Sequence, residues 1–269
     1  MKVIKYLTIV SAVAVLMVSC SKPDGPVTPV GPEPPVPPQP EVMPVPPEEV
    51  VENNLFAVDF FTSLSDEKYF DKRDPSVIIS YIKGLSGRKP LVYMIDRSDF
   101  EVGKANPLLP LARELEYTSY FAQNINSGSY IQGTGMLTFY PVKKYDGVCA
   151  GNNLFMSGCL VNAPLNQSTP VYVYTSRILS ADGFSKIFGL RKERLFKEGV
   201  VIGTVLNSEK EEFKTFIEGA GPLRLSFAGS DSSGYDLFVI VPGSFVCRKI
   251  ESGQKVNHPY YRVTIEKLQ

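Results

Sequence analysis

Proline is concentrated near the start of this 269-residue chain, and that concentration decides which residues can fold. Of the 22 prolines, 12 lie between Pro23 and Pro47, interleaved with Val, Gly and Glu. Proline fixes φ and has no amide hydrogen to donate, so this stretch can neither join a sheet nor continue a helix. At ~3.1 Å per residue it is predicted to form an extended, polyproline-like spacer. A proline-rich docking ligand is the alternative interpretation.

The residues before the spacer are typical of a secretory signal. Lys2 and Lys5 precede an apolar run from Tyr6 to Val18, which is too short and wrongly flanked for a spanning helix. The sequence L-M-V-S-C that ends at Cys20 resembles a bacterial lipoprotein lipobox. That resemblance implies lipidation of Cys20, whereas an ordinary signal peptide with a chance cysteine is the alternative.

These features predict three parts: a lipoprotein signal peptide over residues 1–19, a lipid-anchored proline-rich linker over 20–52, and a folded domain over 53–269. The expected location is the envelope of a diderm bacterium, at the outer membrane, on its periplasmic or its surface face. The membrane is then a partner through the lipid, and an envelope protein or a glycan is the expected ligand.

Charge and cysteine content narrow the partners further. The 28 basic and 28 acidic residues cancel, and no basic run stands out, so no nucleic-acid partner is expected. Cys149, Cys159 and Cys247 remain beyond Cys20. Cys149 and Cys159 are close enough in sequence for a possible disulfide, and a buried free thiol is the equal alternative.

The folded part alternates strands and helices, with strands in the majority. Apolar helical spacing predicts helices over 75–87, 106–115 and 180–197, and a capping box of Ser208 with Glu211 predicts another. Apolar or aromatic runs predict strands over 55–61, 90–95, 117–123, 133–140, 153–162, 170–177, 200–206, 235–241, 245–250 and 260–268. Helices divided between the two halves suggest an α/β fold, a four-layer α-β-β-α sandwich with two sheets packed face to face.

Five stretches in this order resemble the motifs of one family. Residues 106–123 are similar to a helix and the strand that follows it, and residues 133–142 to "G-N-A-I-L-S-R-Y-P-I". Residues 200–209 are similar to "I-L-G-D-F-N" and its helix, residues 235–239 to "I-D-Y-I-F-V", and residues 257–259 to "S-D-H-x-P". Together they resemble the endonuclease/exonuclease/phosphatase superfamily of metal-dependent phosphodiesterases. The resemblance covers nearly all of residues 55–268 and implies that family's sandwich fold.

The resemblance also implies where the catalytic groups should be, and most are replaced. Asp96 stands at the metal position, one methylene shorter than the usual Glu, and His258 keeps the terminal histidine. The family's other histidine falls on Ser176, and its "D-F-N" pair on Thr204 and Leu206, or on Asn207 after a one-residue slip. Asn257 replaces the acidic partner of His258, and Asp236 matches the Asp of "I-D-Y-I-F-V". These relic positions are Asp96, Ser176, Thr204, Asn207, Asp236, Asn257 and His258.

Such enzymes generate hydroxide with a divalent cation and an Asp–His pair, and they steady phosphate with a second histidine. This chain has one histidine, so a mechanism that needs two cannot run. The predicted function is therefore a non-catalytic binding or scaffold lipoprotein with no cofactor. The alternative is a divergent phosphoesterase using Asp96 and His258 with Mg or Mn. Serine or cysteine triads, zinc sites and a P-loop find no matching signature.

Overall fold

The computed structural model describes residues 54–61, 75–85, 89–95, 100–126, 128–149, 155–165, 168–229, 234–255 and 258–268. The predicted signal, Cys20 and the spacer lie outside these residues. No helix in the described ranges is long and apolar enough to cross a membrane.

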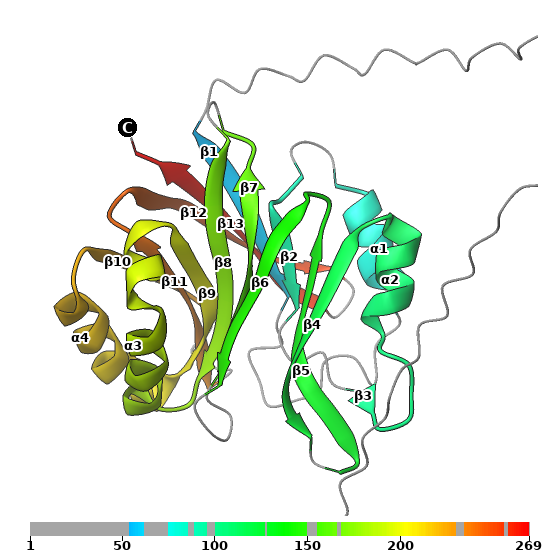
Figure 1. Ribbon diagram of the computed structural model, residues 1–269, viewed down its shortest axis with the longest axis horizontal. Helices are drawn as coiled ribbons and strands as arrows, with labels where there is room; N and C mark the ends of the chain where they lie inside the picture. Colours follow the sequence, from blue (N-terminus) through cyan, green and yellow to red (C-terminus); the bar gives the residue numbers. More distant parts are fainter. Residues whose placement is uncertain are drawn as a thin grey trace, which may run out of the picture. The chain divides into compact units, whose positions relative to one another are not determined.

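Two mixed sheets form the middle of the domain (Figure 1). The first, called sheet A, has the order β12-β13-β1-β2-β5-β3. Its strand β5 pairs with β4 as well as with β2 and β3. Its strands are β1 (Leu55–Phe61), β2 (Val92–Ile95), β3 (Phe100–Glu101), β4 (Thr118–Asn126), β5 (Tyr130–Thr138), β12 (Phe245–Lys255) and β13 (His258–Lys267). The second, sheet B, has the order β10-β11-β9-β8-β7-β6. Its strands are β6 (Val142–Cys149), β7 (Phe155–Ala163), β8 (Thr169–Ile178), β9 (Gly199–Leu206), β10 (Leu223–Ala228) and β11 (Tyr235–Pro242).

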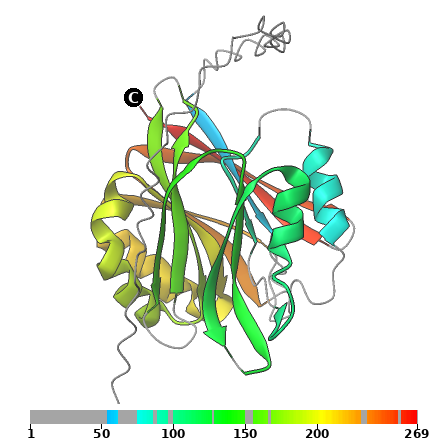
Figure 2. The ribbon, with the colours of Figure 1, turned by 45° about the vertical axis from the view of Figure 1, so that its right-hand side comes forward.

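Helices cover the outer face of each sheet (Figures 1 and 2). The helices α1 (Pro75–Lys83) and α2 (Leu108–Leu115) pack on sheet A through an apolar cluster that includes Ile78, Leu111 and Tyr93. The helices α3 (Ala181–Lys197) and α4 (Lys210–Ala220) pack on sheet B, and the short 3₁₀ helix η1 (Asn207–Glu209) precedes α4. The predicted four-layer α-β-β-α sandwich is confirmed.

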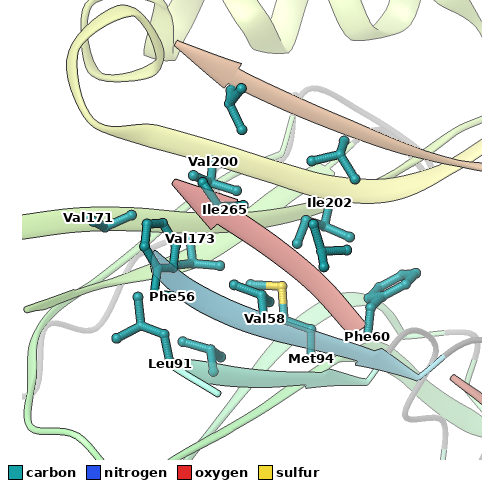
Figure 3. Packing of buried hydrophobic residues seen from close by; sticks show 14 of the residues in the cluster. Phe56, Val58, Phe60, Leu91, Met94, Val171, Val173, Val200, Ile202 and Ile265 are labelled. Atoms are coloured by element: carbon teal, nitrogen blue, oxygen red, sulfur yellow. The ribbon is translucent and has the colours of Figure 1, made fainter. Parts of the chain in front are cut away.

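The core between the sheets follows from strand alternation. Phe56, Val58 and Phe60 of β1 point from sheet A toward β8 and β9 of sheet B, where Val173 and Ile202 meet them (Figure 3). The intervening residues of each strand face the helices, since successive side chains of a strand point to opposite faces. The central strands, such as β9 and β11, are therefore buried on both faces, which explains why they read as continuous apolar runs.

The predicted helices and strands are present, with boundaries shifted by a few residues, and three further strands were not predicted. They are β3, which has two residues, and the edge strands β6 and β10, whose polar or half-buried residues lack a strong apolar pattern. The capping box predicted at Ser208 and Glu211 is wrong. Helix α4 begins after Glu209 with no side-chain cap, and Glu209 instead accepts the backbone N–H of Ala181 at 3.1 Å, at the start of α3.

The disulfide considered for Cys149 and Cys159 is not formed. Both lie in the β6–β7 hairpin, where Cys149 pairs with Phe155 and Cys159 pairs with Tyr145. The two cysteines are thus on different rungs of the ladder, four residues apart along β6, which is beyond the reach of an S–S bond. Cys159 is buried in the core between the sheets, and burial raises the pKa of its thiol to about 12.

Candidate functional site

The carboxyl-terminal ends of the parallel strands in both sheets lie at one end of the sandwich. In sheet A, β1 and β2 run parallel, and Phe61 at the end of β1 pairs with Ile95 on one side and Tyr260 on the other. In sheet B, β8 and β9 run parallel. The opposite end is marked by Lys267 Nζ, which lies 3.0 Å from Thr169 Oγ1 at the start of β8. We call the end with Ile95, Ile178 and Leu206 the site end.

The structure brings four of the predicted positions together at the site end of sheet B. Ser176 pairs with Gly203, next to Thr204, and Asp236 pairs with Val205. Asn207 follows directly in η1, where its backbone N–H donates to Gly234 O at 3.0 Å and its side chain is exposed. These four positions therefore share one end of sheet B.

In sheet A, the predicted positions lie largely outside the described residues. Asp96 and Asn257 belong to undescribed segments, and of His258 only the backbone is described, as the first residue of β13, opposite Lys255. The strands next to them, β2 and β13, do meet at the site end, because both pair with Phe61. The resemblance implies that Asp96, Ser176, Thr204 and His258 converge at one end of the sandwich, and for Asp96 and His258 this stays a prediction.

Ser176 does not face the space between the sheets. It alternates with Val173 and Thr175, so its side chain points toward the helices, and its buried Oγ donates to Phe155 O at 2.6 Å. The Ser176 hydroxyl is therefore bonded to the backbone on the outer face of sheet B. Strand alternation is the physical reason.

Asp236 is also turned outward, and a lysine neutralises it. Its carboxylate is 5 % exposed and lies 2.5 Å from the Nζ of Lys210, at the start of α4. Lys210 also lies over the ring of Phe227, 4.9 Å from the centroid. The one carboxylate among the described relic positions is therefore paired with a cation of the same chain.

Thr204 does face the space between the sheets. It continues the inward series of Val200 and Ile202 along β9, is 0 % exposed, and its Oγ1 has no hydrogen-bond partner. Its neighbour in register on β8 is Arg177, which is 6 % exposed and also points inward. The guanidinium carbon of Arg177 lies 4.1 Å from the ring centroid of Tyr235 on β11.

Sequence reasoning missed Arg177, Tyr235 and Lys210 as members of this end. The sequence did contain an indication for Arg177. It lies an even number of positions after the inward-facing Val171 and Val173, so the strand pattern places a charge in the core, which is unusual. Lys210 carried no such signal, since its partner Asp236 is distant in sequence and only the fold brings them together.

The described residues do not fit a divalent cation. A hard cation needs several oxygen ligands, mostly carboxylates. The inner face at the site end carries instead a neutral hydroxyl beside a guanidinium, and Asp236 is held by Lys210. In the described part of the chain, no three His, Cys, Asp or Glu side chains lie close enough to hold a metal ion.

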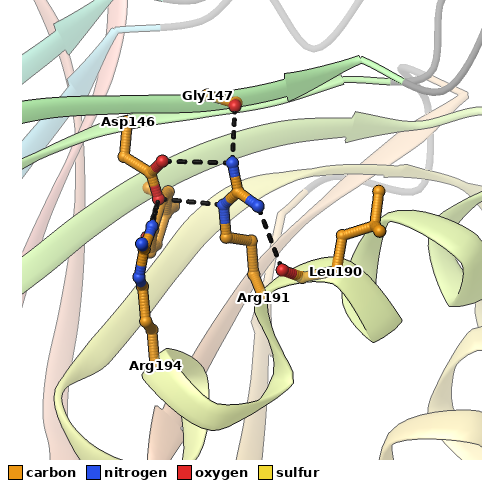
Figure 4. A network of polar contacts seen from close by, with 6 residues as sticks. Asp146, Gly147, Leu190, Arg191 and Arg194 are labelled. Atoms are coloured by element: carbon orange, nitrogen blue, oxygen red, sulfur yellow. Dashed lines mark hydrogen bonds and ion pairs between the residues drawn. The ribbon is translucent and has the colours of Figure 1, made fainter.

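A second polar cluster lies on the outer face of sheet B (Figure 4). Asp146 of β6 accepts from Tyr174 Oη at 2.6 Å, from Arg191 Nε at 2.9 Å and from Arg194 Nη1. Arg191 also donates to Gly147 O at 2.7 Å. This cluster connects the edge strand to α3, and its polar atoms bond to one another, so we assign it a structural role.

Comparison with known proteins agrees with the geometry. No family model and no curated protein matches this sequence. Among solved structures, an endonuclease/exonuclease/phosphatase family protein from Leptotrichia buccalis C-1013-b superposes with a TM-score of 0.57 at 10% identity, over 78% of this chain and 99% of its own. The chain has the endonuclease/exonuclease/phosphatase fold.

Two further structures share this fold. A humanised D. rerio TDP2 carrying 14 mutations gives a TM-score of 0.53 at 10% identity, over 80% of this chain and 100% of its own. A functionally unknown conserved protein from Enterococcus faecalis V583 gives 0.54 at 11% identity, over 79% of this chain and 100% of its own. At identities this low the similarity establishes the fold alone.

Proposed function

We propose that this chain is a cell-envelope lipoprotein whose phosphodiesterase-like domain binds a ligand or partner without hydrolysing phosphate esters. In this proposal, Cys20 carries lipid at the outer membrane, and the proline-rich segment spaces the domain from it. An envelope protein or a glycan is the partner class. The domain keeps the fold of its structural neighbours and uses the site end for recognition.

The observation that carries the proposal is the lack of a carboxylate among the described residues on the inner face of sheet B at the site end, where Thr204 lies. Thr204 stands where the resemblance implies a carboxylate, and the buried Arg177 lies next to it in register. The family's hydrolysis needs a divalent cation held by carboxylate oxygens, and a threonine hydroxyl supplies no such ligand. With one histidine in the chain, the groups needed to make and use hydroxide are too few.

The competing function is a divergent metal-dependent phosphoesterase that uses Asp96 and His258. It draws support from the positions of the neighbouring strands, since β2 ends and β13 begins at the same end of sheet A. The two functions differ in one observable, which is hydrolysis that requires a metal ion.

The test uses the full-length protein purified in detergent, with Mg²⁺ or Mn²⁺ and with phosphodiester and phosphomonoester substrates. We expect no metal-dependent turnover above that of the buffer. Turnover that disappears in both Asp96→Ala and His258→Ala overturns the proposal and establishes the phosphoesterase. Turnover that persists in both variants identifies a contaminating hydrolase, and its removal must restore the expected absence.

A further inference from the structure

A row of aromatic side chains reaches the surface where β5 leads into β6. Phe139 directly follows β5 and is 55% exposed. Its ring centroid lies 5.9 Å from that of Tyr117 and 5.8 Å from that of Tyr140. Tyr117 in turn stacks at 5.9 Å on Tyr93, which is buried. We call Tyr117, Phe139 and Tyr140 the aromatic row. Because each ring rests on the next, the row is held in place before any partner binds.

Lysines lie beside the aromatic row. Lys89 is exposed, and its Nζ lies 3.9 Å from the ring centroid of Phe139. Lys143 and Lys144 follow Phe139 within five residues and are also exposed, whereas the exposed Glu116 opposes them. Three lysines against one glutamate leave this part of the surface positive, so an acidic partner is favoured.

The aromatic row lies at the end of sheet A where the chain enters the domain. Thr138, the last residue of β5, donates its hydroxyl to Leu91 O at 2.8 Å, and Leu91 N–H donates to Ala57 O at 2.7 Å. Ala57 belongs to the first turn of the pleat of β1, which begins at Leu55. The row is therefore separated from the start of β1 by two strand spacings of ~4.8 Å each. Residues that precede Leu55 join the sheet at this same end.

The proline-rich segment has the chemistry that suits this surface. Residues 23–52 contain 12 prolines and six acidic residues, and they contain no Lys, Arg or His. Proline-rich segments form extended helices of about three residues per turn, and exposed aromatic rings are the surfaces on which such helices dock. Since such a helix is already extended before it binds, docking costs little conformational entropy. The negative charge of the segment also matches the lysines beside the row.

We infer that the aromatic row binds the acidic, proline-rich segment of this chain, residues 23–52. Proline rings pack against Phe139 and its neighbours, and Lys89 pairs with a carboxylate of the segment. The inference goes beyond the proposed function, because it assigns a partner to a surface away from the site end and does not depend on the loss of hydrolysis. The segment is then a ligand as well as a spacer.

Fluorescence anisotropy with a labelled synthetic peptide of residues 32–52 tests the inference. The receptor is the full-length protein in detergent, in a variant whose own residues 32–52 are replaced by a Gly-Ser sequence of equal length. We expect saturable one-to-one binding with a dissociation constant below about 1 mM. The wild type should bind the peptide more weakly, because its own segment competes. Absence of binding to the Gly-Ser variant, or equal binding by the wild type, overturns the inference.

Two altered peptides separate proline recognition from simple charge attraction. A peptide with alanine in place of every proline keeps the charge and should bind at least about tenfold more weakly, because it must lose more conformational entropy and has no proline rings to pack. A peptide with Gln in place of every Glu should bind roughly three- to tenfold more weakly at low salt. Unchanged binding of the alanine peptide shows attraction by charge alone and overturns the inference.

Substitutions in the Gly-Ser variant test the surface. Phe139→Ser should weaken peptide binding about tenfold or more, because a central aromatic contact is lost. Leu190→Ser is the matched control, since Leu190 is 59% exposed and belongs to α3, which packs on sheet B. Equal binding by these two variants overturns the inference.

A second substitution covers the case in which Phe139→Ser does not fold. Lys89→Glu replaces an exposed side chain and should weaken binding roughly three- to tenfold, with the loss reduced at high salt. Unchanged binding by Lys89→Glu overturns the charge pairing and with it the inference. The hydrolysis test of the proposed function involves neither the peptide nor the aromatic row, so either proposal can fail alone.

Discussion

Asp146 provides a sharp test of how the outer layers are held, because one carboxylate joins β6 to α3. Asp146→Asn keeps the shape of the side chain and removes its charge. Tyr174 is 0 % exposed, so a weakened bond to its hydroxyl costs about 1–3 kcal/mol. The side chains of Arg191 and Arg194 are 20% and 36% exposed, so water replaces much of what they lose. We expect a total loss of about 2–4 kcal/mol.

The assay is urea denaturation at pH 7, with the free energy of unfolding obtained by linear extrapolation. Glu114→Gln is the control. Glu114 lies as close to Lys83, at 2.6 Å, but both side chains are 54% exposed, so we expect no measurable change. If Asp146→Asn unfolds at the same urea concentration as the wild type, the network does not stabilise the fold and our account of α3 docking is wrong.

The pH dependence of the free energy of unfolding, compared between wild type and Asp146→Asn, gives a second test. Burial raises the pKa of Asp146, but hydrogen bonds from Tyr174, Arg194 and Arg191 outweigh burial and hold the pKa below its usual range. A carboxyl with a lowered pKa in the folded state contributes stability above its ordinary pKa and loses it as the pH falls. The difference between wild type and Asp146→Asn should therefore shrink below about pH 4. A difference that stays constant to pH 3 contradicts this assignment.

Further predictions concern the buried ion pair, the close-packed glycine and the anchor. Asp59 is fully buried and accepts two hydrogen bonds from Arg262, at 2.8 and 2.9 Å. Asp59→Ala should therefore lower the free energy of unfolding in urea by about 3–5 kcal/mol. The double variant Asp59→Leu with Arg262→Leu should be neutral or stabilising. A double variant as unstable as Asp59→Ala contradicts this reading. A Cβ on Gly203 would lie 1.9 Å from Ser176 O, whereas one on Gly189 meets nothing within 4 Å. Gly203→Ala should therefore lower the melting temperature severely and Gly189→Ala raise stability by about 0.5–1 kcal/mol, and equal effects would refute the packing. Cys20→Ala should move the protein from the membrane to the soluble fraction, since an acyl chain contributes ~0.8 kcal/mol per buried CH₂, and retention in membranes contradicts the anchor.

The sandwich could be predicted because its evidence is local and repeated. Strands such as β1 and β9 are buried on both faces and read as continuous apolar runs, and α3 shows helical spacing over its whole length. The edge strand β6 could not be found this way, because its Lys143, Lys144 and Asp146 are polar and its pairing depends on β7.

For the candidate site, the sequence could predict which residues belong to it but not the direction in which their side chains point. The resemblance predicted that Asp96, Ser176, Thr204 and His258 meet at one end of the sandwich, and of these Ser176 and Thr204 lie close together near the ends of β8 and β9. It did not predict which face each side chain takes, because a one-residue difference in register exchanges inner and outer faces. Ser176 and Asp236 point to the helices because each is one residue out of phase with the inward-facing residues of its strand. The pairing of Asp236 with Lys210 joins two elements whose packing no local pattern encodes.

Binding of Mn²⁺ is the most direct test of the central claim, because it precedes any choice of substrate. In this assay, Mn²⁺ that binds to the full-length protein is lost from the paramagnetic resonance signal of free Mn²⁺. The account predicts no stoichiometric site with a dissociation constant below about 1 mM. One equivalent of Mn²⁺ bound more tightly than that, and released in Asp96→Ala, would show that the metal centre survives and would contradict the account.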